Sequence, residues 1–198
     1  MYPISKRIFD VISSLVVLLI LSPFLMIIWL VVVTGSRGGG YYRQTRVGKN
    51  GVEFPIWKFR TMRRNADKSG KLTIGNDTRV TGFGKFLRRS KLDEIPQLFN
   101  VIGGQMSVVG PRPEVPEYVK LYSAEQLKVL NVRPGLTDLA TLKYIDEQKV
   151  LGEVADPRQV YVEKIMPEKL RLNLQYIENR GFFKDLGLIF KTIGRLFG

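Results

Sequence analysis

Two adjacent carboxylates, Asp93 and Glu94, are the residues whose type and setting best suit catalysis. Pro96 follows them, and proline is accepted in the first turn of a helix while it favours an extended conformation at the preceding residue, Ile95. We therefore expect both acids at the N-terminal edge of a short helix, where free N–H groups and the helix dipole attract anions. An ionised Asp93 could ligate Mg²⁺ there or attack phosphorus. Simple capping of the helix by acidic side chains is the alternative interpretation.

Composition excludes several other kinds of chemistry. The 198 residues include 31 Lys and Arg, 18 Asp and Glu, and neither Cys nor His. Disulfides, zinc fingers and thiol or imidazole catalysis are therefore excluded, which leaves carboxylates, Lys, Arg, Tyr, Ser or a hard metal ion. The net charge of +13 indicates a polyanionic partner, which could be nucleic acid, anionic lipid or a phosphorylated substrate.

Arg112 is the second candidate for chemistry because it lies between Pro111 and Pro113. The two prolines fix the backbone, so less entropy is lost when the guanidinium forks onto a phosphate. A rigid surface loop with an ion pair would produce the same pattern.

Further basic residues could bind phosphate. Arg133 precedes Pro-Gly, which suits a type II turn that displays Arg133 and the hydroxyl of Thr137. Lys58 and Arg60 share one face of a predicted strand, and Arg88 belongs to the basic stretch that leads to the two acids. A solvated face is the usual explanation for such charges.

A long apolar segment precedes all of these residues. No charge occurs from Val11 to Gly35, and a 23-residue helix from Val11 to Val33 would extend about 34 Å, enough for a bilayer core of about 30 Å. No signal-peptide cleavage site follows, so we expect a retained anchor over residues 1–35 and a membrane-associated catalytic domain over residues 36–198.

Ser22 and Pro23 lie in the middle of the anchor, and a bend is expected there because proline removes a backbone donor while the serine hydroxyl can satisfy a freed carbonyl. Basic residues flank both ends of the segment, which favours a helix-break-helix hairpin that enters and leaves one leaflet, although a kinked span stays open. Asp10 borders the segment and would be costly there unless paired, and Arg7 lies three residues earlier on the same helical face.

The rest of the chain predicts an α+β fold that is mainly helical with a small β-hairpin. Residues 39–62 resemble a hairpin that turns at Lys49-Asn50-Gly51, and residues 65–81 a surface loop. Other elements follow from periodicity: helices at 83–89, 96–102, 114–121, 124–129 and 156–179, the last broken or restarted at Pro167, and a strand at 106–109.

The C-terminal segment predicts an amphipathic helix. Apolar residues recur at spacings of three and four, with Lys184, Asp185, Lys191 and Arg195 on the other side. A basic amphipathic helix suits a membrane surface, and the alternative is a terminal helix that packs against the protein core. The short helix at 83–89 could also lie at the membrane interface.

Several stretches carry a family resemblance: KRIFDVISS, the Ser22-Pro23 break, FPIWKFRTM, KFLRRSKLDEIPQLFNVIGGQMSVVGPRP and VRPGLT. With these residues the chain closely resembles the bacterial sugar transferase family, the monotopic phosphoglycosyl transferases that prime surface-glycan assembly on polyprenyl phosphate. The resemblance extends from about Ser5 to Ile193.

The resemblance implies a mechanism and a location. Asp93 would attack the sugar-linked phosphate of a nucleoside-diphosphate sugar, and polyprenyl phosphate would then receive the phosphosugar. The nucleotide used by the family is usually UDP. Glu94 would help to hold Mg²⁺ or manage protons, and Arg112 would hold a phosphate. Arg7 and Asp10 would fix a re-entrant helix broken at Ser22-Pro23, on the cytoplasmic face of the bacterial inner membrane.

One departure concerns the segment after Arg133. The family commonly reads RPG-x-TG-LAQ, whereas here Asp138 and Thr141 replace Gly and Gln, so details of nucleotide or sugar recognition do not carry over from this segment. A membrane-tethered nucleic-acid-binding protein, and an inactive scaffold of the same fold, are the alternatives; no nucleic-acid motif supports the first. The sugar, the glycan pathway and the oligomeric state, a homo-oligomer included, stay open.

Overall fold

The computed structural model describes residues 2–36, 38–64, 77–144 and 147–197. These residues form a mainly helical fold with a two-stranded antiparallel hairpin and a second, parallel two-stranded sheet. The prediction of a mainly helical α+β chain with a small hairpin is confirmed. Most of the loop expected over residues 65–81 lies outside the described residues.

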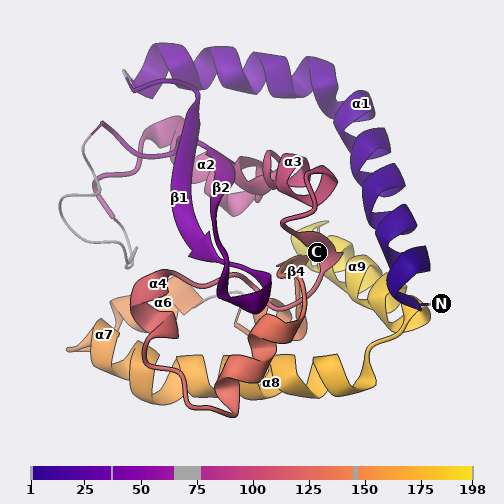
Figure 1. Ribbon diagram of the computed structural model, residues 1–198. Helices are drawn as coiled ribbons and strands as arrows, with labels where there is room; N and C mark the ends of the chain where they lie inside the picture. Colours follow the sequence, from indigo (N-terminus) through magenta and orange to yellow (C-terminus); the bar gives the residue numbers. More distant parts are fainter. Residues whose placement is uncertain (1, 37, 65–76, 145–146, 198) are drawn as a thin grey trace.

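The N-terminal helix α1 (Tyr2–Ser36) bends in its middle and turns a corner around the rest of the molecule (Figure 1). Pro23, which has no N–H to donate to the Leu19 carbonyl, lies inside it. Ser22 Oγ donates to that same carbonyl at 2.8 Å. The serine thus replaces the donor that proline lacks, as the sequence analysis expected.

Much of the surface of α1 is apolar and exposed, with Leu19 76% and Ile20 65% exposed. Of the helices that the structure describes, α1 is long and apolar enough to cross a bilayer. An apolar surface of this size is typical of membrane-associated segments.

The first turns of α1 are held to the globular part by Arg7 and Asp10, though not through each other. Arg7 donates to the carbonyls of Val101 (2.6 Å) and Ile102 (2.9 Å). Asp10 is buried and accepts from Ser107 Oγ at 2.7 Å and, more weakly, from Val108 N at 3.2 Å. The pairing of Asp10 with Arg7 that we expected is replaced by these contacts, because the globular part offers each side chain closer partners.

Strands β1 (Tyr41–Val47) and β2 (Glu53–Phe59) form the hairpin, which lies between α1 and the C-terminal helices (Figure 1). The turn is a 3-10 helix, η1 (Lys49–Gly51), with Asn50 at φ 58° and Gly51 at φ 78°. These positive φ values explain the Asn-Gly pair, since both residues tolerate the left-handed region. The predicted hairpin and turn are confirmed.

Helix α2 (Gly82–Arg89) leads through Lys91, at φ 56°, into the 3-10 turn η3 (Leu92–Glu94) and helix α3 (Gln97–Ile102). The left-handed residue turns the chain sharply, so the acids of η3 come directly before α3, as predicted. The prediction of an extended conformation for Ile95 is wrong. This residue is helical rather than extended, because its N–H bonds to the Leu92 carbonyl and so continues η3 toward α3.

Strands β3 (Ser107–Val109) and β4 (Gly135–Thr137) pair in parallel. The chains cross so closely at Gly110 and Gly135 that a Cβ on Gly135 would lie 2.1 Å from Gly110 N. The type II turn expected around Gly135 is therefore replaced by a short strand, which the backbone partners on β3 and the glycine pair make possible.

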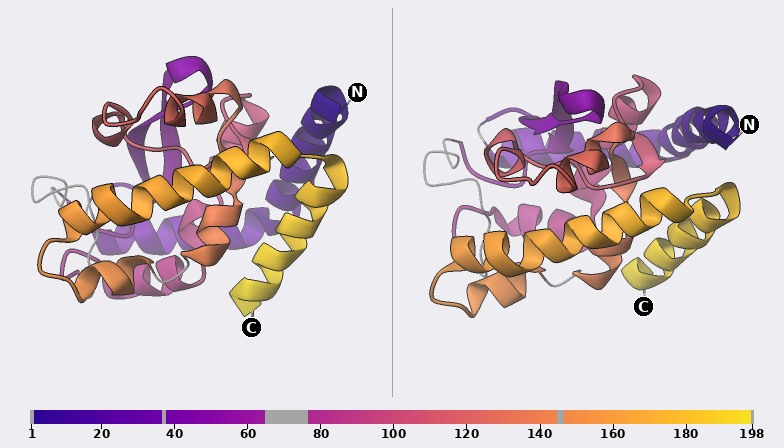
Figure 2. Two further views of the ribbon diagram at one scale, coloured as in Figure 1. Left: turned by 90° about the horizontal axis from the view of Figure 1, so that it is seen from below. Right: turned by 60° about the horizontal axis from the view of Figure 1, so that its bottom comes forward.

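The C-terminal half is mainly helical, and its long helix crosses the near side of the molecule in Figure 2. Helix α8 (Met166–Asn179) has Pro167 in its first turn and follows a π-helical segment, η5 (Tyr161–Ile165), so the restart predicted at Pro167 is confirmed. The remaining helices are α4 (Pro116–Val119), η4 (Gln126–Asn131), α5 (Leu139–Lys143), α6 (Glu147–Gly152) and α7 (Pro157–Val160).

The last helix, α9 (Phe182–Phe197), packs beside the start of α1. Asp185, which we assigned to its polar side, is buried and accepts from Lys6 and Tyr176, each at 2.7 Å. That assignment is wrong because α1 supplies a cation that draws the carboxylate inward. Phe183, 84% exposed, and Phe190, 69% exposed, leave apolar surface on this helix uncovered.

Candidate active site

A cavity of about 310 Å³ lies between the hairpin, the Asp93 turn and helices α4 and α8. Asp93, Glu94, Arg112, Lys58, Arg60 and Arg88, all proposed from the sequence, line it. A cavity of this size is at the lower end of the range of small-molecule binding sites.

Asp93 has a buried carboxylate in this cavity. It is 7% exposed, and its Oδ1 has no hydrogen-bond partner among the described residues. A buried carboxylate oxygen without a donor is poorly stabilised, so this carboxylate would gain from a partner that a bound ligand supplies.

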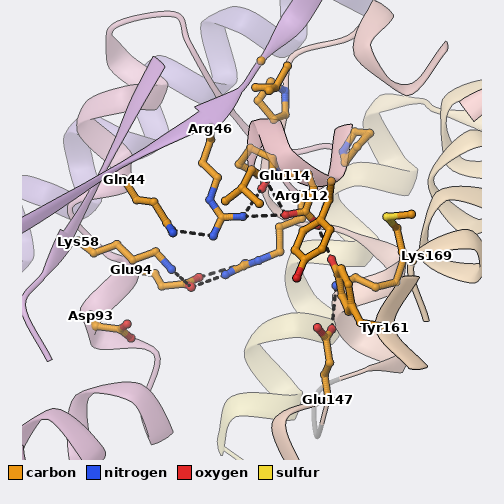
Figure 3. A pocket seen from close by; sticks show the side chains of 18 of the residues that line it. Gln44, Arg46, Lys58, Asp93, Glu94, Arg112, Glu114, Glu147, Tyr161 and Lys169 are labelled. Carbon is orange, nitrogen blue, oxygen red and sulfur yellow. Dashed lines mark hydrogen bonds and ion pairs between the residues drawn. The ribbon is translucent and has the colours of Figure 1, made fainter. Parts of the chain in front are cut away.

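Glu94, in contrast, is fully engaged. Its carboxylate accepts from Lys58 Nζ at 2.8 Å and from both terminal nitrogens of Arg112, one of them at 3.2 Å (Figure 3). Two cations on different elements, β2 and the Pro-Arg-Pro turn, are therefore fixed by one acid from η3.

The two neighbouring acids have oppositely shifted pKa values. Burial raises the pKa of Asp93 to about 6, the charge of Glu94 adds to the increase, and Lys58 and Arg88 oppose it. Burial would raise the pKa of Glu94 as well, but Arg112 and Lys58 outweigh it and hold that pKa well below its usual range. Glu94 stays ionised at neutral pH, whereas Asp93 titrates close to neutrality.

Arg112 is positioned through its backbone by Asp138. The fully buried carboxylate of Asp138 accepts from Arg112 N at 2.8 Å and also caps α5 by accepting from Thr141 N. The residue that departs from the usual family pattern therefore holds the Pro-Arg-Pro turn, so the turn has support from both a side chain and two prolines.

Arg60 and Arg88 line the cavity but also make structural contacts. Arg88 Nε donates to Thr61 Oγ1 at 2.8 Å, and Arg60 donates to the carbonyls of Gly39 and Tyr41, both at 3.2 Å. With Arg63 and Lys91 they form the cationic part of the cavity wall. Their unused donors and charge make this part suited to phosphates.

The structure places Arg133 and Thr137 away from this cavity. Arg133 Nε donates to the Gly104 carbonyl at 2.8 Å, and Thr137 Oγ1 hydrogen-bonds to Thr192 Oγ1 at 2.6 Å. Neither residue lines the cavity, because β4 pairs with β3 and directs this segment toward α3 and α9. Their contacts join elements of the fold.

A second ionic group in the cavity wall was not predicted from the sequence. Arg46 on β1 donates to Glu114 Oε1 at 3.2 Å, and Glu114 also accepts from the hydroxyl of Tyr161. Lys169 on α8 pairs with Glu147 at 2.7 Å nearby (Figure 3). A signal for Arg46 was present, since it shares a strand face with Tyr42 and Gln44 at a spacing of two.

The donor set fits a hard cation only if the substrate contributes to it. No group of three or more His, Cys, Asp or Glu that could hold a metal occurs among the described residues. Both oxygens of Glu94 already accept from cations, whereas Asp93 Oδ1 accepts no hydrogen bond from the described residues. Mg²⁺ is often held by one or two carboxylates together with substrate phosphates, and this set suits that arrangement.

An apolar groove of about 640 Å³ adjoins the polar cavity. Side chains of α1, α3 and the hairpin line it, among them Leu19, Met26, Trp29 and Phe99, and Phe59 lines both the groove and the cavity. A hydrocarbon chain could lie in such a groove while a polar head enters the cavity.

Comparisons with known proteins agree with these features. The family model described as bacterial sugar transferase matches residues 1–198. The chain is 35% identical to the exopolysaccharide production protein ExoY of Rhizobium meliloti (strain 1021), over 96% of this chain and 84% of that protein. It is 40% identical to the UDP-glucose:undecaprenyl-phosphate glucose-1-phosphate transferase of Klebsiella pneumoniae, over 95% of this chain and 39% of that longer protein.

A third relative carries a different sugar in its name. The UDP-N-acetylgalactosamine-undecaprenyl-phosphate N-acetylgalactosaminephosphotransferase of Aeromonas hydrophila is 33% identical over 97% of this chain, which spans 43% of that relative. The relatives thus share this unit and differ both in length and in the sugars that their names give.

Proposed function

Because this chain belongs to the bacterial sugar transferase family, we propose that it transfers a sugar 1-phosphate from a UDP-sugar to a polyprenyl phosphate. The products are UMP and a polyprenyl-diphospho-sugar, which would begin the assembly of a surface glycan. The observation that carries the proposal is Asp93, a buried carboxylate with a pKa of about 6 and an oxygen that accepts no hydrogen bond from the described residues, beside a fixed group of cations.

In the first step, the Asp93 carboxylate attacks the phosphorus that carries the sugar. A bond forms between the carboxylate oxygen and phosphorus as the bond from phosphorus to the UMP oxygen breaks, and UMP leaves with that electron pair. Arg112, Lys58 and Arg88 supply positive charge where negative charge develops on the phosphate oxygens. The result is a phosphosugar held on Asp93.

In the second step, an oxygen of the polyprenyl phosphate attacks the same phosphorus. The bond between Asp93 and phosphorus breaks, the carboxylate is restored, and the lipid carries a diphosphate linked to the sugar. The groove under α1 supports this acceptor, since it is apolar and Phe59 lines both the groove and the cavity.

The acidic pair suits Mg²⁺ that arrives with a phosphorylated substrate. When bound, it would neutralise charge on the phosphate oxygens as the bond to UMP breaks. Asp93 and Glu94 are the residues that would hold it. Glu94 would continue to hold Arg112 and Lys58 in position.

We propose that α1 is a re-entrant anchor at the cytoplasmic face of the bacterial inner membrane, and that α2 and α9 lie at the interface. Three features support this: the bend of α1, the apolar side chains along it, and the exposed phenylalanines of α9. The layout would bring a cytosolic nucleotide and a lipid phosphate to one site.

The test is to incubate purified protein and Mg²⁺ with UDP-sugars, with and without polyprenyl phosphate. Without lipid, UMP release should stop at one equivalent per enzyme, because Asp93 stays occupied. With lipid, release should continue, and Asp93→Asn should abolish both. Release of UMP by Asp93→Asn at the normal rate would contradict the proposal.

A further inference from the structure

We infer that the wall formed by α4, η5 and α8 binds the sugar of the donor, and that the nucleoside lies on the cationic side of the site. This inference rests on the proposed function. We call this wall the aromatic part of the cavity. It is formed by Tyr118 of α4, Tyr161 of η5, and Lys169 and Asn173 of α8, together with Tyr122, which follows α4, and Glu147, the first residue of α6.

The two parts of the cavity lie on opposite sides of the Glu94–Arg112 pair. Figure 3 shows Asp93 on one side of this pair and Tyr161, Lys169 and Glu147 on the other. Phosphorus at Asp93 would therefore lie close to the Glu94–Arg112 pair, and a substituent on it that reached the far side of the cavity would pass this pair.

Charge distinguishes the two parts. The cationic part has four positive side chains (Arg60, Arg63, Arg88 and Lys91), and its acid is Asp93. In the aromatic part Lys169 is balanced by Glu147, and the neighbouring Arg46 is balanced by Glu114. Excess positive charge suits phosphates, whereas a balanced wall suits a neutral group with many hydroxyls.

Two buried polar atoms on this side of the cavity lack partners within the described residues. Asn173, 4% exposed, belongs to the buried face of α8 with Met166 and Leu170, and its Oδ1 accepts no hydrogen bond. Arg46 Nε, on the neighbouring strand β1, is also buried and donates to nothing. Buried polar groups are usually satisfied, so an acceptor in the wall and a donor beside it that both lack partners indicate a ligand that offers both, as a sugar hydroxyl does.

The order of the reaction separates the sugar from the nucleoside. In an in-line double displacement the lipid phosphate attacks from the side that UMP has left, because Asp93 occupies the opposite side in both steps. UMP must leave and the acceptor must enter by the same route, while the sugar stays on phosphorus throughout. The group that is retained suits the buried wall of Tyr161 and Asn173, and the group that leaves suits the more exposed cationic part, where Arg63 is exposed.

The experiment measures kcat/KM for UMP release from UDP-glucose, UDP-galactose and their N-acetylated counterparts, together with inhibition by UMP, for the full chain and for Asn173→Ala. We expect kcat/KM for the preferred donor to fall about tenfold, the value of one lost hydrogen bond, and discrimination among the sugars to change. The inhibition constant for UMP should stay within about twofold of the wild-type value.

Asn179→Ala is the matched control, since Asn179 is exposed on the same helix and hydrogen-bonds to the Gln175 carbonyl. It should leave all of these values unchanged. If Asn173→Ala does not fold, Asn173→Asp keeps the size of the side chain and replaces the amide group, and it should alter sugar discrimination in the same assay.

The outcomes are distinct. Weaker inhibition by UMP with unchanged sugar discrimination would place the nucleoside in the aromatic part and overturn the inference, as would variants at Asn173 that fold and behave as wild type. If the wild-type protein releases UMP from none of the donors, the proposed function itself fails. Wild-type turnover together with indifferent Asn173 variants would overturn only the inference.

Discussion

The carboxylates of Asp93 and Glu94 are neighbours in the chain, yet their surroundings shift their pKa values in opposite directions. Glu94 accepts from Lys58 and Arg112 and stays ionised, whereas Asp93 is buried and its Oδ1 has no partner among the described residues. One acid therefore positions cations while the other has an oxygen without a hydrogen-bond partner among the described residues. Such a division between adjacent groups is typical of sites that perform acid–base or nucleophilic chemistry.

The first prediction concerns pH. Only the ionised form of Asp93 can attack phosphorus, and burial raises its pKa to about 6. The rate of UMP release in the first turnover should therefore fall about tenfold per pH unit below 6 and become constant above about 7. Rapid-quench measurements between pH 5 and 8 would check this, and a flat profile over that range would contradict it.

Glu94→Gln should change that profile in a defined direction. Removing the negative charge of Glu94 lowers the pKa of Asp93, because that charge helps to raise it. The inflection of the pH–rate profile should move below pH 6. The rate on the plateau at higher pH should fall, because Arg112 and Lys58 lose their shared partner. An unmoved inflection would show that the two acids do not interact.

The second prediction concerns stability. A carboxyl with a pKa of about 6 in the folded protein and about 4 in the unfolded chain binds protons more tightly when folded. It therefore destabilises the fold increasingly as pH rises from about 4 to 6, and by a constant amount above that range. Asp93→Asn should raise the free energy of unfolding at pH 7 by roughly 1 to 3 kcal/mol.

Chemical denaturation of both proteins in detergent at pH 7 and pH 4.5 measures this effect. The advantage of Asp93→Asn should be large at pH 7 and should shrink at the lower pH, where Asp93 is protonated in the folded wild type. A variant that is less stable than wild type at pH 7 would contradict the pKa assigned to Asp93.

The third prediction concerns Asp138, which accepts from Arg112 N at 2.8 Å. Asp138→Asn directs an amide group toward one of the two N–H donors that Asp138 binds, so the Pro-Arg-Pro turn should shift and kcat/KM should fall roughly tenfold to a hundredfold. Asp156→Asn is a matched control, since Asp156 caps α7 by accepting from Gln159 N at 2.9 Å and does not line the cavity. Equal effects of the two variants on turnover would argue against a positioning role for Asp138.

The fourth prediction concerns topology. The chain has no cysteine, so Ile4→Cys and Val52→Cys each introduce one exposed thiol, the first on α1 and the second after the hairpin turn. If α1 is re-entrant, an impermeant maleimide should label both in inverted inner-membrane vesicles and neither in spheroplasts. Labelling of Ile4→Cys in spheroplasts would indicate a helix that crosses the membrane.

Local chemistry explains what could be predicted from the sequence. Asn50-Gly51 requires positive φ values, and Ser22 compensates for the proline beside it, so the turn and the bend of α1 follow from residues that are neighbours in the chain. The position of Asp93 and Glu94 before α3 follows in the same way.

Long-range contacts explain what could not be predicted. Asp185 is buried because Lys6, which is distant in sequence, donates a hydrogen bond to it. Arg133 lies outside the cavity because the neighbouring strand β4 pairs with β3. The pairing of Arg46 with Glu114 likewise joins separate elements. No periodicity or motif within one segment of the chain identifies a partner in a distant segment.

The central claim is that Asp93 itself carries the phosphosugar. Enzyme mixed with a UDP-sugar and Mg²⁺ in the absence of lipid, then quenched in acid and digested, should give a peptide containing Asp93 whose mass is increased by one sugar phosphate. Addition of polyprenyl phosphate before the quench should remove the adduct, and Asp93→Asn should never form it. An adduct on any other residue, or turnover in which no adduct can be trapped while lipid is withheld, would contradict the account.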